Sequence, residues 1–489
     1  MTQKQIFLNL QSNQYMYYTG GMIMTRLIRT LLVVALLGGL WFLPVPAGLS
    51  VQAWHLFAIF AATILGFILQ PMPLGAVALA GITFAALTGT LKPAAALAGF
   101  SNTTIWLIVA AFLFAKGFIK TGLGRRIAYK LIESFGSSTL KLGYTLVISD
   151  FIISPATPSN TARSGGIMFP IVRSLASAFA SEPGPTARKI GAFILVTSFQ
   201  ADASIAAMFL TACAPNPLMA TLAMQTAGVD LSWGTWAMAA IVPGLLSMLI
   251  IPYFIYRIYP PDVKKTPEAQ ALARQELAAM GAMTRAEKII SCIFVGALLL
   301  WSTSQYTRLD ATVVALLGVT IMLATEVLTW KDVLAEQGAW DSMMWMGSIV
   351  GLAEALNKEG FIPWFAQSVT GLLDGVSWIP TLGVLFIVYL YSHYAFASLS
   401  AHATAMYAAF LAVAVSAGAP PYLAALGLAV LSNLMAGLTH YATGAAPIYF
   451  GTGFIEQKDW WRIGFLVSVL NFMLWIGCGS AWWKFIGLW

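Results

Sequence analysis

Charged side chains are scarce in this sequence of 489 residues. Lysine and arginine number 26, aspartate and glutamate number 19, and together they make up 9% of the chain. A typical soluble protein carries about 25% charged residues, so this supply is too small to cover the surface of soluble domains of this length. The scarcity of charge excludes a soluble protein, a disordered chain and a nucleic-acid-binding protein.

Cysteine and histidine are also rare, with three and four residues. Cys213, Cys292 and Cys478 lie far apart in apolar surroundings, without the spacing of a disulfide scaffold or a metal site, and we interpret them as packing residues. The sequence lacks the H-E-x-x-H pair of metalloproteases, a nucleophile elbow and a phosphate-binding loop. We therefore expect no enzymatic activity, no catalytic residue, no cofactor and no resident metal.

Apolar residues are abundant instead, at 59% of the chain, and 13% of all residues are aromatic. A helix needs about 20 apolar residues to cross the hydrocarbon core of a bilayer. Uninterrupted segments that approach this length lie near 29–45, 52–70, 73–91, 103–119, 231–256, 287–303, 310–328, 338–357 and 462–483. The sequence therefore predicts an all-α polytopic membrane protein.

Four further apolar stretches are interrupted. Residues 142–175 and 380–416 are punctuated midway by small and polar residues, and we predict that they form re-entrant hairpins. Residues 189–222 and 420–453 are longer than one span and contain proline and glycine, so we predict broken helices that each cross once. The total is about 11 transmembrane helices plus two hairpins.

The basic residues predict the orientation, because cytoplasmic loops are enriched in lysine and arginine. With a cytoplasmic N-terminus and an external C-terminus, nearly all basic residues fall inside, whereas Arg163 falls within a hairpin. The N-terminal segment resembles neither a cleaved signal nor a transit peptide, so we expect a bacterial inner membrane. The C-terminal tryptophans predict an aromatic belt at the membrane interface: Trp460, Trp461, Trp482, Trp483 and Trp489.

The same order of elements occurs twice. A span with Trp106 precedes the first hairpin and broken span, and a span with Trp345 precedes the second pair. Each half has an odd number of crossings, so the halves are inverted relative to each other. The predicted organisation is a polar segment 1–28, a first helix 29–51, a first repeat 52–256, a cytoplasmic amphipathic connector 257–286 and a second repeat 287–489.

Inverted repeats with broken elements indicate a secondary transporter with its site near the bilayer midplane. Non-helical backbone is tolerated in a membrane only where protein or a wet cavity surrounds it, and its freed amides and carbonyls can then bind ions. In the first hairpin, two prolines precede Ser159, Asn160 and Thr161, which can cap a helix and donate to a carboxylate. The alternative is that these side chains bond only to their own helix.

This Ser-Asn-Thr tip, the repeat order and the ending DWWRIGFLVSVLNFMLWIGCGSAWWKFIGLW resemble the divalent anion/sodium symporter family. The sequence is most similar to its exchanger branch, the citrate/succinate, tartrate/succinate and 2-oxoglutarate/malate antiporters. The resemblance implies that a Ser-Asn-Thr motif at each hairpin tip holds substrate carboxylates, with sodium sites nearby. It also implies an elevator-type movement of the hairpin-containing part and a homodimer.

This chain departs from the family pattern in its second half, where the motif position has Ser400, Ala401 and His402. Together with the first motif, we expect these residues, Thr443 and Pro447 to bind substrate. Residues at the helix breaks are candidates for an ion site: Ala212, Cys213, Pro215, Asn216 and Gly444. The altered second motif puts sodium binding in doubt, so no metal is assigned.

Arg163 and His402 are the candidates for charge compensation. A dicarboxylate needs about two positive charges at the midplane, supplied by travelling sodium ions or by fixed side chains. Fixed charges stay behind when substrate leaves, so an empty carrier reorients reluctantly and exchange of one anion for another follows. Two alternatives stay open: Arg163 extends to the inner headgroups, or His402 is a neutral, hydrogen-bonded residue.

Three further residues have open roles. Asp150 and Asp202 are either protonated structural carboxyls or ion-pair partners of Arg163, and a proton-coupling role is a third alternative. His440, beside the second break, is a weak site candidate. The prediction is a di- or tricarboxylate exchanger whose partners are small carboxylate anions, membrane lipid and a second copy of the chain. The alternatives are a sodium-coupled symporter of the same fold or a channel.

Overall fold

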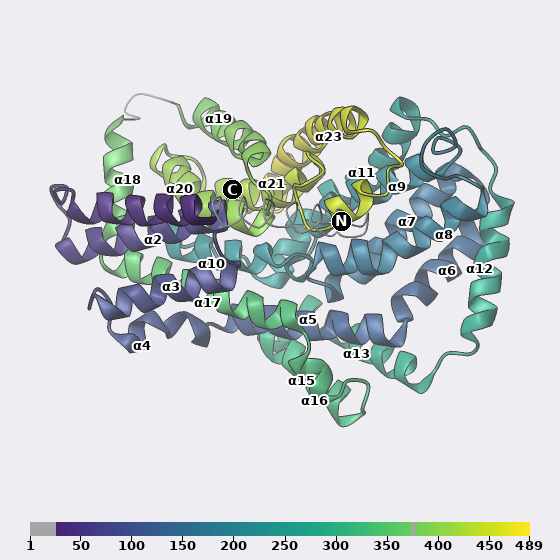
Figure 1. Cartoon of the computed structure of the whole chain (residues 1–489), viewed down its shortest axis with the longest axis horizontal. Coiled ribbons are helices and arrows are strands. Elements are labelled where there is room, and N and C mark those ends of the chain that lie inside the picture. The colour runs from purple at the N-terminus through teal and green to yellow at the C-terminus, as the bar shows by residue number, and fades with distance from the viewer. Residues whose placement is uncertain (1–25, 373–376) are drawn as a thin grey trace, which may run out of the picture. The chain divides into compact units, whose positions relative to one another are not determined.

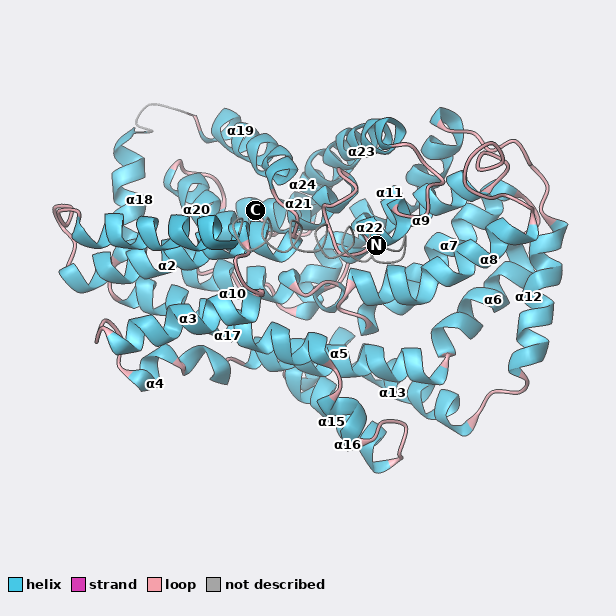
Figure 2. Ribbon diagram, viewed as in Figure 1, coloured by secondary structure: helices cyan, strands magenta, loops and turns pink. Residues whose placement is uncertain are grey.

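The structure is a computed structural model that describes residues 26–372 and 377–489, and every regular element in these ranges is a helix (Figures 1 and 2). Residues 26–42 are helical. The next helices are α2 Val51–Leu69, α3 Leu74–Leu87, α4 Pro93–Ala96, α5 Thr103–Thr121, α6 Leu123–Phe135, α7 Thr139–Ile153, α8 Phe169–Ala178, α9 Gly191–Ala206, α10 Pro215–Ala227, α11 Trp233–Ile258 and α12 Pro267–Met280.

The second half of the chain continues the all-helical pattern. Its helices are α13 Arg285–Ser302, α14 Ser304–Thr307, α15 Ala311–Ala324, α16 Trp330–Leu334, α17 Gln337–Lys358, α18 Phe361–Leu372, α19 Trp378–Tyr391, α20 Leu399–Ser416, α21 Pro421–Leu434, α22 Ala446–Phe450, α23 Gln457–Phe472 and α24 Gly479–Phe485. A π-helical stretch, Met473–Cys478, joins the last two into one long helix.

Every predicted continuous span coincides with a helix. Within the described ranges, six helices are long and apolar enough to cross a membrane, and several more, such as α3 and α15, are apolar but shorter. The presence of these helices follows from local apolar runs. The number of crossings stays a prediction.

All four predicted interruptions are present. In the first hairpin region, α7 ends at Ile153 and a 3₁₀ turn, Ser154–Ala156, leads to a π-helical turn, Thr161–Met168, that continues into α8. In the second, a 3₁₀ turn, Ser392–Ala395, separates α19 from α20. The broken spans divide into α9 and α10, and into α21 and α22. In the two broken spans, proline lies in the first turn of the helix that follows, Pro215 as the first residue of α10 and Pro447 as the second of α22, where its missing N–H is not needed.

Of the helices that were not predicted, α6 and α18 are the longer ones, and α4, α14 and α16 are short helices between predicted spans. The search for apolar spans overlooks α6 because this helix is amphipathic and packs against the predicted connector helix α12. Ala269 and Ala273 of α12 are buried in that contact region, and Arg125 of α6 lies 3.5 Å from Glu276. The connector therefore forms the expected helix, but part of its surface is covered by protein.

Two predictions about single residues were wrong. Trp460 and Trp483 are fully buried, so these two side chains belong to the core and not to an interfacial belt. Cys292 and Cys478 are exposed, so only Cys213 is a packing cysteine. Exposure of apolar side chains carries little penalty where lipid replaces water, and composition alone therefore does not tell an outward-facing cysteine from a buried one.

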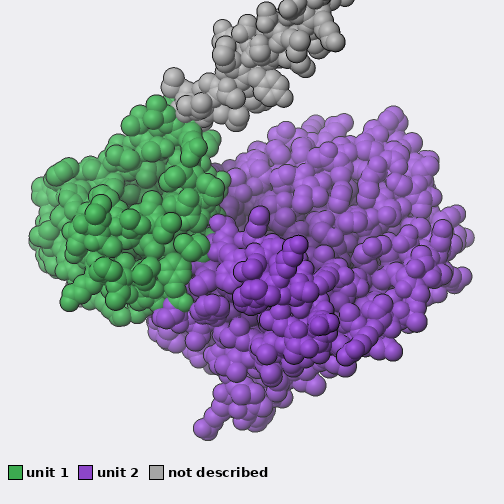
Figure 3. Space-filling model, turned by 60° about the horizontal axis from the view of Figure 1, so that its bottom comes forward, with its two compact units in different colours: residues 1–100, 344–364 green, residues 101–343, 365–489 purple. Residues whose placement is uncertain are grey.

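The chain divides into two compact units, coloured separately in Figure 3. One unit contains residues 1–100 and 344–364, and the other contains residues 101–343 and 365–489. These boundaries do not coincide with the predicted repeats, since each unit draws on both halves of the sequence. Both predicted hairpin regions and both broken spans lie in the second unit, which therefore contains every candidate site residue.

Candidate functional site

The first hairpin tip is a capped helix start. The Oγ of Ser159 accepts a hydrogen bond from the backbone N–H of Ala162 at 3.2 Å, which satisfies one of the free amides of the helix that begins there. Ser159 is half-buried, Asn160 is buried and Thr161 is exposed. The three motif residues therefore differ in what they can reach, and Thr161 is the one that faces outward.

Arg163 is fully buried directly behind this tip. Its Nε donates to Oδ1 of Asp150 at 2.9 Å and its Nη2 donates to Oδ1 of Asp202 at 2.7 Å. The sequence left open whether Arg163 pairs with Asp150 and Asp202, and in the structure it forms ion pairs with both. An arginine that extends to the headgroups is not compatible with this placement.

Backbone oxygens complete the surroundings of the guanidinium. Its Nη1 donates to the carbonyl of Thr157 at 2.9 Å and to the carbonyl of Ala212 at 2.8 Å. A buried charge is tolerated only when counter-charges and hydrogen bonds replace its hydration. The carbonyls come from the two helix breaks of the first half, which explains why the charge lies where the chain is not helical.

The remaining polar groups of the first half extend the same network. The Nδ2 of Asn160 donates to Oδ2 of Asp202 at 3.2 Å, and the thiol of Cys213 donates to Oδ1 of Asn160 at 2.9 Å. The structure thus joins Asn160 of the motif with Ala212 and Cys213 of the broken span. From the sequence, Asn160 was predicted to bind substrate, whereas Ala212 and Cys213 were predicted to belong to an ion site.

Asn216 joins the two broken helices. Its Nδ2 donates to the carbonyls of Ala206 and Phe209, both at 2.9 Å, and so replaces the helical hydrogen bonds that the break removes. Its Oδ1 accepts from Nδ2 of Asn433 at 2.7 Å. Asn433 was missed by the sequence analysis, although a lone asparagine in the apolar helix α21 was a signal for it.

The second hairpin tip has its cap two residues earlier than the sequence alignment of the halves predicts. The Oγ of Ser398 accepts from the backbone N–H of Ala401 at 3.3 Å, in the manner of Ser159. Ser398 therefore corresponds to Ser159. The distance along the sequence between these two serines equals the distance between Trp106 and Trp345, the tryptophans of the two preceding spans. Ser400 is half-buried in the first turn of α20.

His402 and His393 are both fully buried beside this tip. The Nε2 of His402 lies 2.9 Å from Oγ of Ser392, which itself donates to the carbonyl of Tyr389, so the imidazole nitrogen is the donor. The Nε2 of His393 donates to the carbonyl of Ala442 at 2.9 Å. In the described part of the chain neither imidazole has an acidic partner, so this arrangement suits neutral rings.

The second helix break borders the first motif. A Cβ added at Gly444 would collide with Oγ1 of Thr161, and one added at Gly165 would lie 2.6 Å from Cδ1 of Ile448. The hydroxyl of Tyr449 donates to the carbonyl of Ser164 at 3.1 Å. Tyr449 is a further residue that the sequence analysis missed, because a tyrosine after a proline carries no distinctive pattern.

An exposed surface remains where these elements meet. Thr161, Gly444 and Pro447 are exposed there, whereas Thr443 is buried to 7% exposure. His393 links the second hairpin to the same break through Ala442, so residues 442–447 lie between the two hairpin tips. His440 accepts a hydrogen bond from Nε1 of Trp461 at 3.1 Å, which is a packing role.

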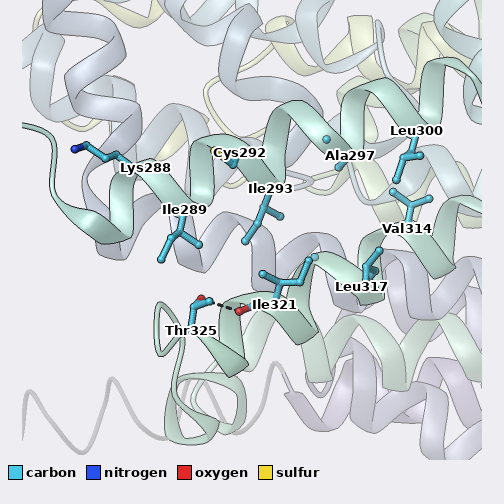
Figure 4. A pocket seen from close by; sticks show the side chains of 12 residues that line it. Lys288, Ile289, Cys292, Ile293, Ala297, Leu300, Val314, Leu317, Ile321 and Thr325 are labelled. Carbon is cyan, nitrogen blue, oxygen red and sulfur yellow. Dashed lines mark hydrogen bonds between the residues drawn. The ribbon is translucent and has the colours of Figure 1, made fainter.

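A separate apolar pocket of about 480 Å³ lies between α13 and α15 (Figure 4). Its lining is almost entirely aliphatic, with Lys288 at one end. The hydroxyl of Thr325, which also lines it, is bonded to the carbonyl of Ile321 at 2.7 Å. The pocket contains none of the residues nominated above, and its apolar walls cannot bind a carboxylate, so it is not the candidate site.

Comparison with known proteins gives a consistent family. A family model described as "Sodium:sulfate symporter transmembrane region" matches residues 24–489. The "Putative malate transporter YflS" of Bacillus subtilis is 51% identical over 465 residues, which cover 95% of this chain and 97% of that protein. "Dicarboxylate transporter 1, chloroplastic" of Arabidopsis thaliana is 49% identical over 92% of this chain and 81% of its own length.

Two further matches extend this result. "Inner membrane protein YbhI" of Escherichia coli is 38% identical over 95% of this chain and 98% of that protein. Among solved structures, the YdaH transporter of Alcanivorax borkumensis matches with a TM-score of 0.50 at 12% identity, covering 83% of this chain and 88% of that one. The last match shows a shared helical membrane-transporter fold.

Proposed function

The chain belongs to the sodium:sulfate symporter family, and from that premise we propose that it is a secondary transporter of dicarboxylates in a bacterial inner membrane. The relatives named for malate and dicarboxylate transport, at about half identical residues, support the substrate class. The relatives carry transporter names, consistent with a chain that is not an enzyme. Substrates of the 2-oxoglutarate, malate, succinate, tartrate or citrate class are the ones we expect.

We assign the substrate to the exposed surface at the junction of the first motif and the second break. Thr161 offers a hydroxyl there, and the lack of a side chain at Gly444 lets this hydroxyl lie directly against the second break. Each hairpin supplies a serine-capped helix start, at Ser159 and Ser398, whose amides favour an anion. Two helix starts from opposite halves suit a molecule with two carboxylates.

The observation that carries exchange is the place of the Arg163 guanidinium. It is hydrogen-bonded to carbonyl and carboxylate oxygens, the atoms that bind hard cations in proteins. A tethered cation in such an oxygen cage takes the place of an ion that would travel with the substrate. Burying an arginine in a membrane costs at least about 2.5–3.5 kcal/mol, so it stays where its partners are.

Exchange follows from this immobility. Because no cation leaves with the substrate at this half of the site, we propose that the carrier reorients only when another anion is bound. His402 is buried without an acidic partner in the described part of the chain, so we assign the tethered cation to Arg163, which is held in place by its counter-ion Asp202. The movement is an elevator-type displacement of the hairpin-containing part, and the working form is a homodimer with a cytoplasmic N-terminus and an external C-terminus.

Proteoliposomes test this proposal. We expect uptake of labelled dicarboxylate only into vesicles preloaded with an unlabelled dicarboxylate, with no stimulation by sodium. Sodium-stimulated uptake into empty vesicles would contradict exchange and support a symporter, and current without counter-substrate would support a channel. Competition by a panel of unlabelled acids identifies the preferred anion, and failure of every di- and tricarboxylate to compete contradicts the substrate class.

A further inference from the structure

The buried network around Arg163 contains one carboxylate more than it needs. Asp150, Asp202 and Arg163 are each at most 2% exposed, and they lie in direct contact. One guanidinium balances one carboxylate. If both acids were ionised, the network would carry an uncompensated negative charge away from water, which is strongly unfavourable.

The two aspartates differ in their partners. Both oxygens of Asp202 accept hydrogen bonds, Oδ1 from Arg163 and Oδ2 from Asn160. Only Oδ1 of Asp150 accepts one, from Arg163, and its Oδ2 is buried with no hydrogen-bond partner in the described part of the chain. The ionised form is thus far better stabilised at Asp202 than at Asp150.

We propose that this network is a proton-binding site that holds one proton on Oδ2 of Asp150. In two coupled acids a proton belongs first to the pair. Here the unequal partners assign it, because Asp202 receives two donors and Asp150 receives one. With that proton the network is electrically neutral, and Asp202 alone is the counter-ion of Arg163.

The neighbouring titratable groups supply no alternative counter-charge. The thiol of Cys213 donates to Asn160, and the hydroxyl of Tyr449, the nearest group of α22, donates to Ser164. On α6, the buried Arg126 is paired with Glu287. On α11, Tyr253 faces Tyr144 of α7. A second cation for Asp150 is therefore not at hand in any of these elements.

The proton also holds the first helix breaks together. Arg163 anchors the carbonyls of Thr157 and Ala212, and Asp202 anchors Asn160 of the motif. Loss of the proton leaves two anions competing for one guanidinium and loosens these anchors. The protonated form is populated at low pH and lost as the pH rises, so the native arrangement weakens on the alkaline side. This inference does not depend on which anion is carried.

Infrared spectroscopy of the purified full-length protein tests the proton directly. We expect the wild type to show the carbonyl band of a buried protonated carboxylic acid, and Asp150→Asn to lack it. Asp332→Asn is the matched control, because it removes a carboxyl outside the network, paired with Lys120, and should keep the band. A band that persists in Asp150→Asn would place the proton elsewhere and overturn the proposal.

Thermal unfolding in detergent gives a second readout. We expect the wild type to lose thermal stability as the pH is raised to the alkaline side, whereas Asp150→Asn, which mimics a neutral acid, shows a flat profile. Asp202→Asn removes the carboxylate with the better hydrogen bonds and turns an amide toward the Arg163 donor. Asp150 must then lose its proton to balance the guanidinium, and we expect a larger loss of thermal stability than in Asp150→Asn. Equal damage from both substitutions would show that both acids are ionised and overturn the proposal.

These readouts are separate from transport. If the protein fails to exchange dicarboxylates but keeps the infrared band, the proposed function is wrong and the proton site stands. If exchange occurs and the band is missing from the wild type, the proton site is wrong and the proposed function stands.

Discussion

The two hairpin tips of this protein meet the same requirement with different chemistry. Both interrupt a helix inside an apolar protein and both restart it with a serine cap, at Ser159 and Ser398. Behind the first tip lies a charged network of one arginine and two aspartates. Behind the second lie two histidines among aromatic rings, bonded to a hydroxyl and a carbonyl.

The difference shows that corresponding interruptions in the two halves of the sequence keep a serine cap while their other interactions diverge. A helix break needs its backbone groups satisfied, and either an arginine or neutral side chains can do this. Only the charged version places a fixed cation at the break. We therefore expect substitutions in the first tip to be more damaging than equivalent ones in the second.

Removing the cation of the first tip should have the largest effect. Arg163→Met leaves Asp202 without its counter-ion and two carbonyls without donors, and we expect a loss of about 3–5 kcal/mol in stability, together with loss of exchange. Arg163→Lys is the control, since it keeps the charge but cannot reach all four oxygens. Thermal unfolding and exchange in proteoliposomes measure both. A stable, active Met variant would contradict the role of the network.

The link between the two halves should come next. Asn216→Ala leaves the carbonyls of Ala206 and Phe209 unpaired and breaks the bond to Asn433, and we expect a loss of about 1–3 kcal/mol. Asn433→Ala keeps the two carbonyl bonds of Asn216 and should lose less. A double-mutant cycle of unfolding free energies measures the coupling. Strictly additive losses would show that the two asparagines act independently.

The junction of the first motif with the second break should be sensitive in transport more than in stability. Gly444→Ala puts a methyl group against the hydroxyl of Thr161, and we expect exchange to fall about tenfold. Gly166→Ala is the matched control, because a Cβ there meets nothing within 4 Å. Initial rates of exchange measure both variants. Equal rates would mean that substrate does not pass this junction.

The neutral tip should tolerate change better. His402→Gln keeps a donor but shifts it from Ser392, and we expect a loss of about 0.5–1.5 kcal/mol with exchange still measurable. Unfolding in detergent compared with Arg163→Met measures the contrast between the tips. A loss as large as that of the arginine variant would remove the distinction drawn between them.

A partly exposed ion pair, between Lys120 and Asp332, should matter least. The hydrogen bond from Lys120 to Asp332 holds the pKa of that carboxyl well below its usual range. Its stabilising contribution is therefore present above the ordinary aspartate pKa and is lost as the pH falls through the lowered value. Because the pair is partly exposed, Asp332→Asn should cost only about 0–1 kcal/mol in thermal unfolding at neutral pH. A larger loss of stability would mean that this partly exposed pair contributes as much as the buried network around Arg163.

Much of the architecture was predictable because it depends on local properties of the chain. Apolar runs identified the continuous spans, and proline with small polar residues identified all four interruptions. Helix α6 was missed because it is amphipathic, so it contains no long apolar run of the kind that identified the other helices. Ser398 was missed because alignment of the halves compares residue types, whereas a cap is defined by which amide the hydroxyl reaches.

The sequence by itself determined the class of protein, the continuous apolar helices, the four places where apolar stretches are interrupted and the presence of one arginine within such a stretch. These are consequences of composition and of short-range backbone chemistry. Only the tertiary structure decided what surrounds that arginine. Asp150, Asp202 and Ala212 come from three separate segments. The state of a buried charge depends on the groups that packing brings within hydrogen-bond distance, and sequence spacing does not give those distances.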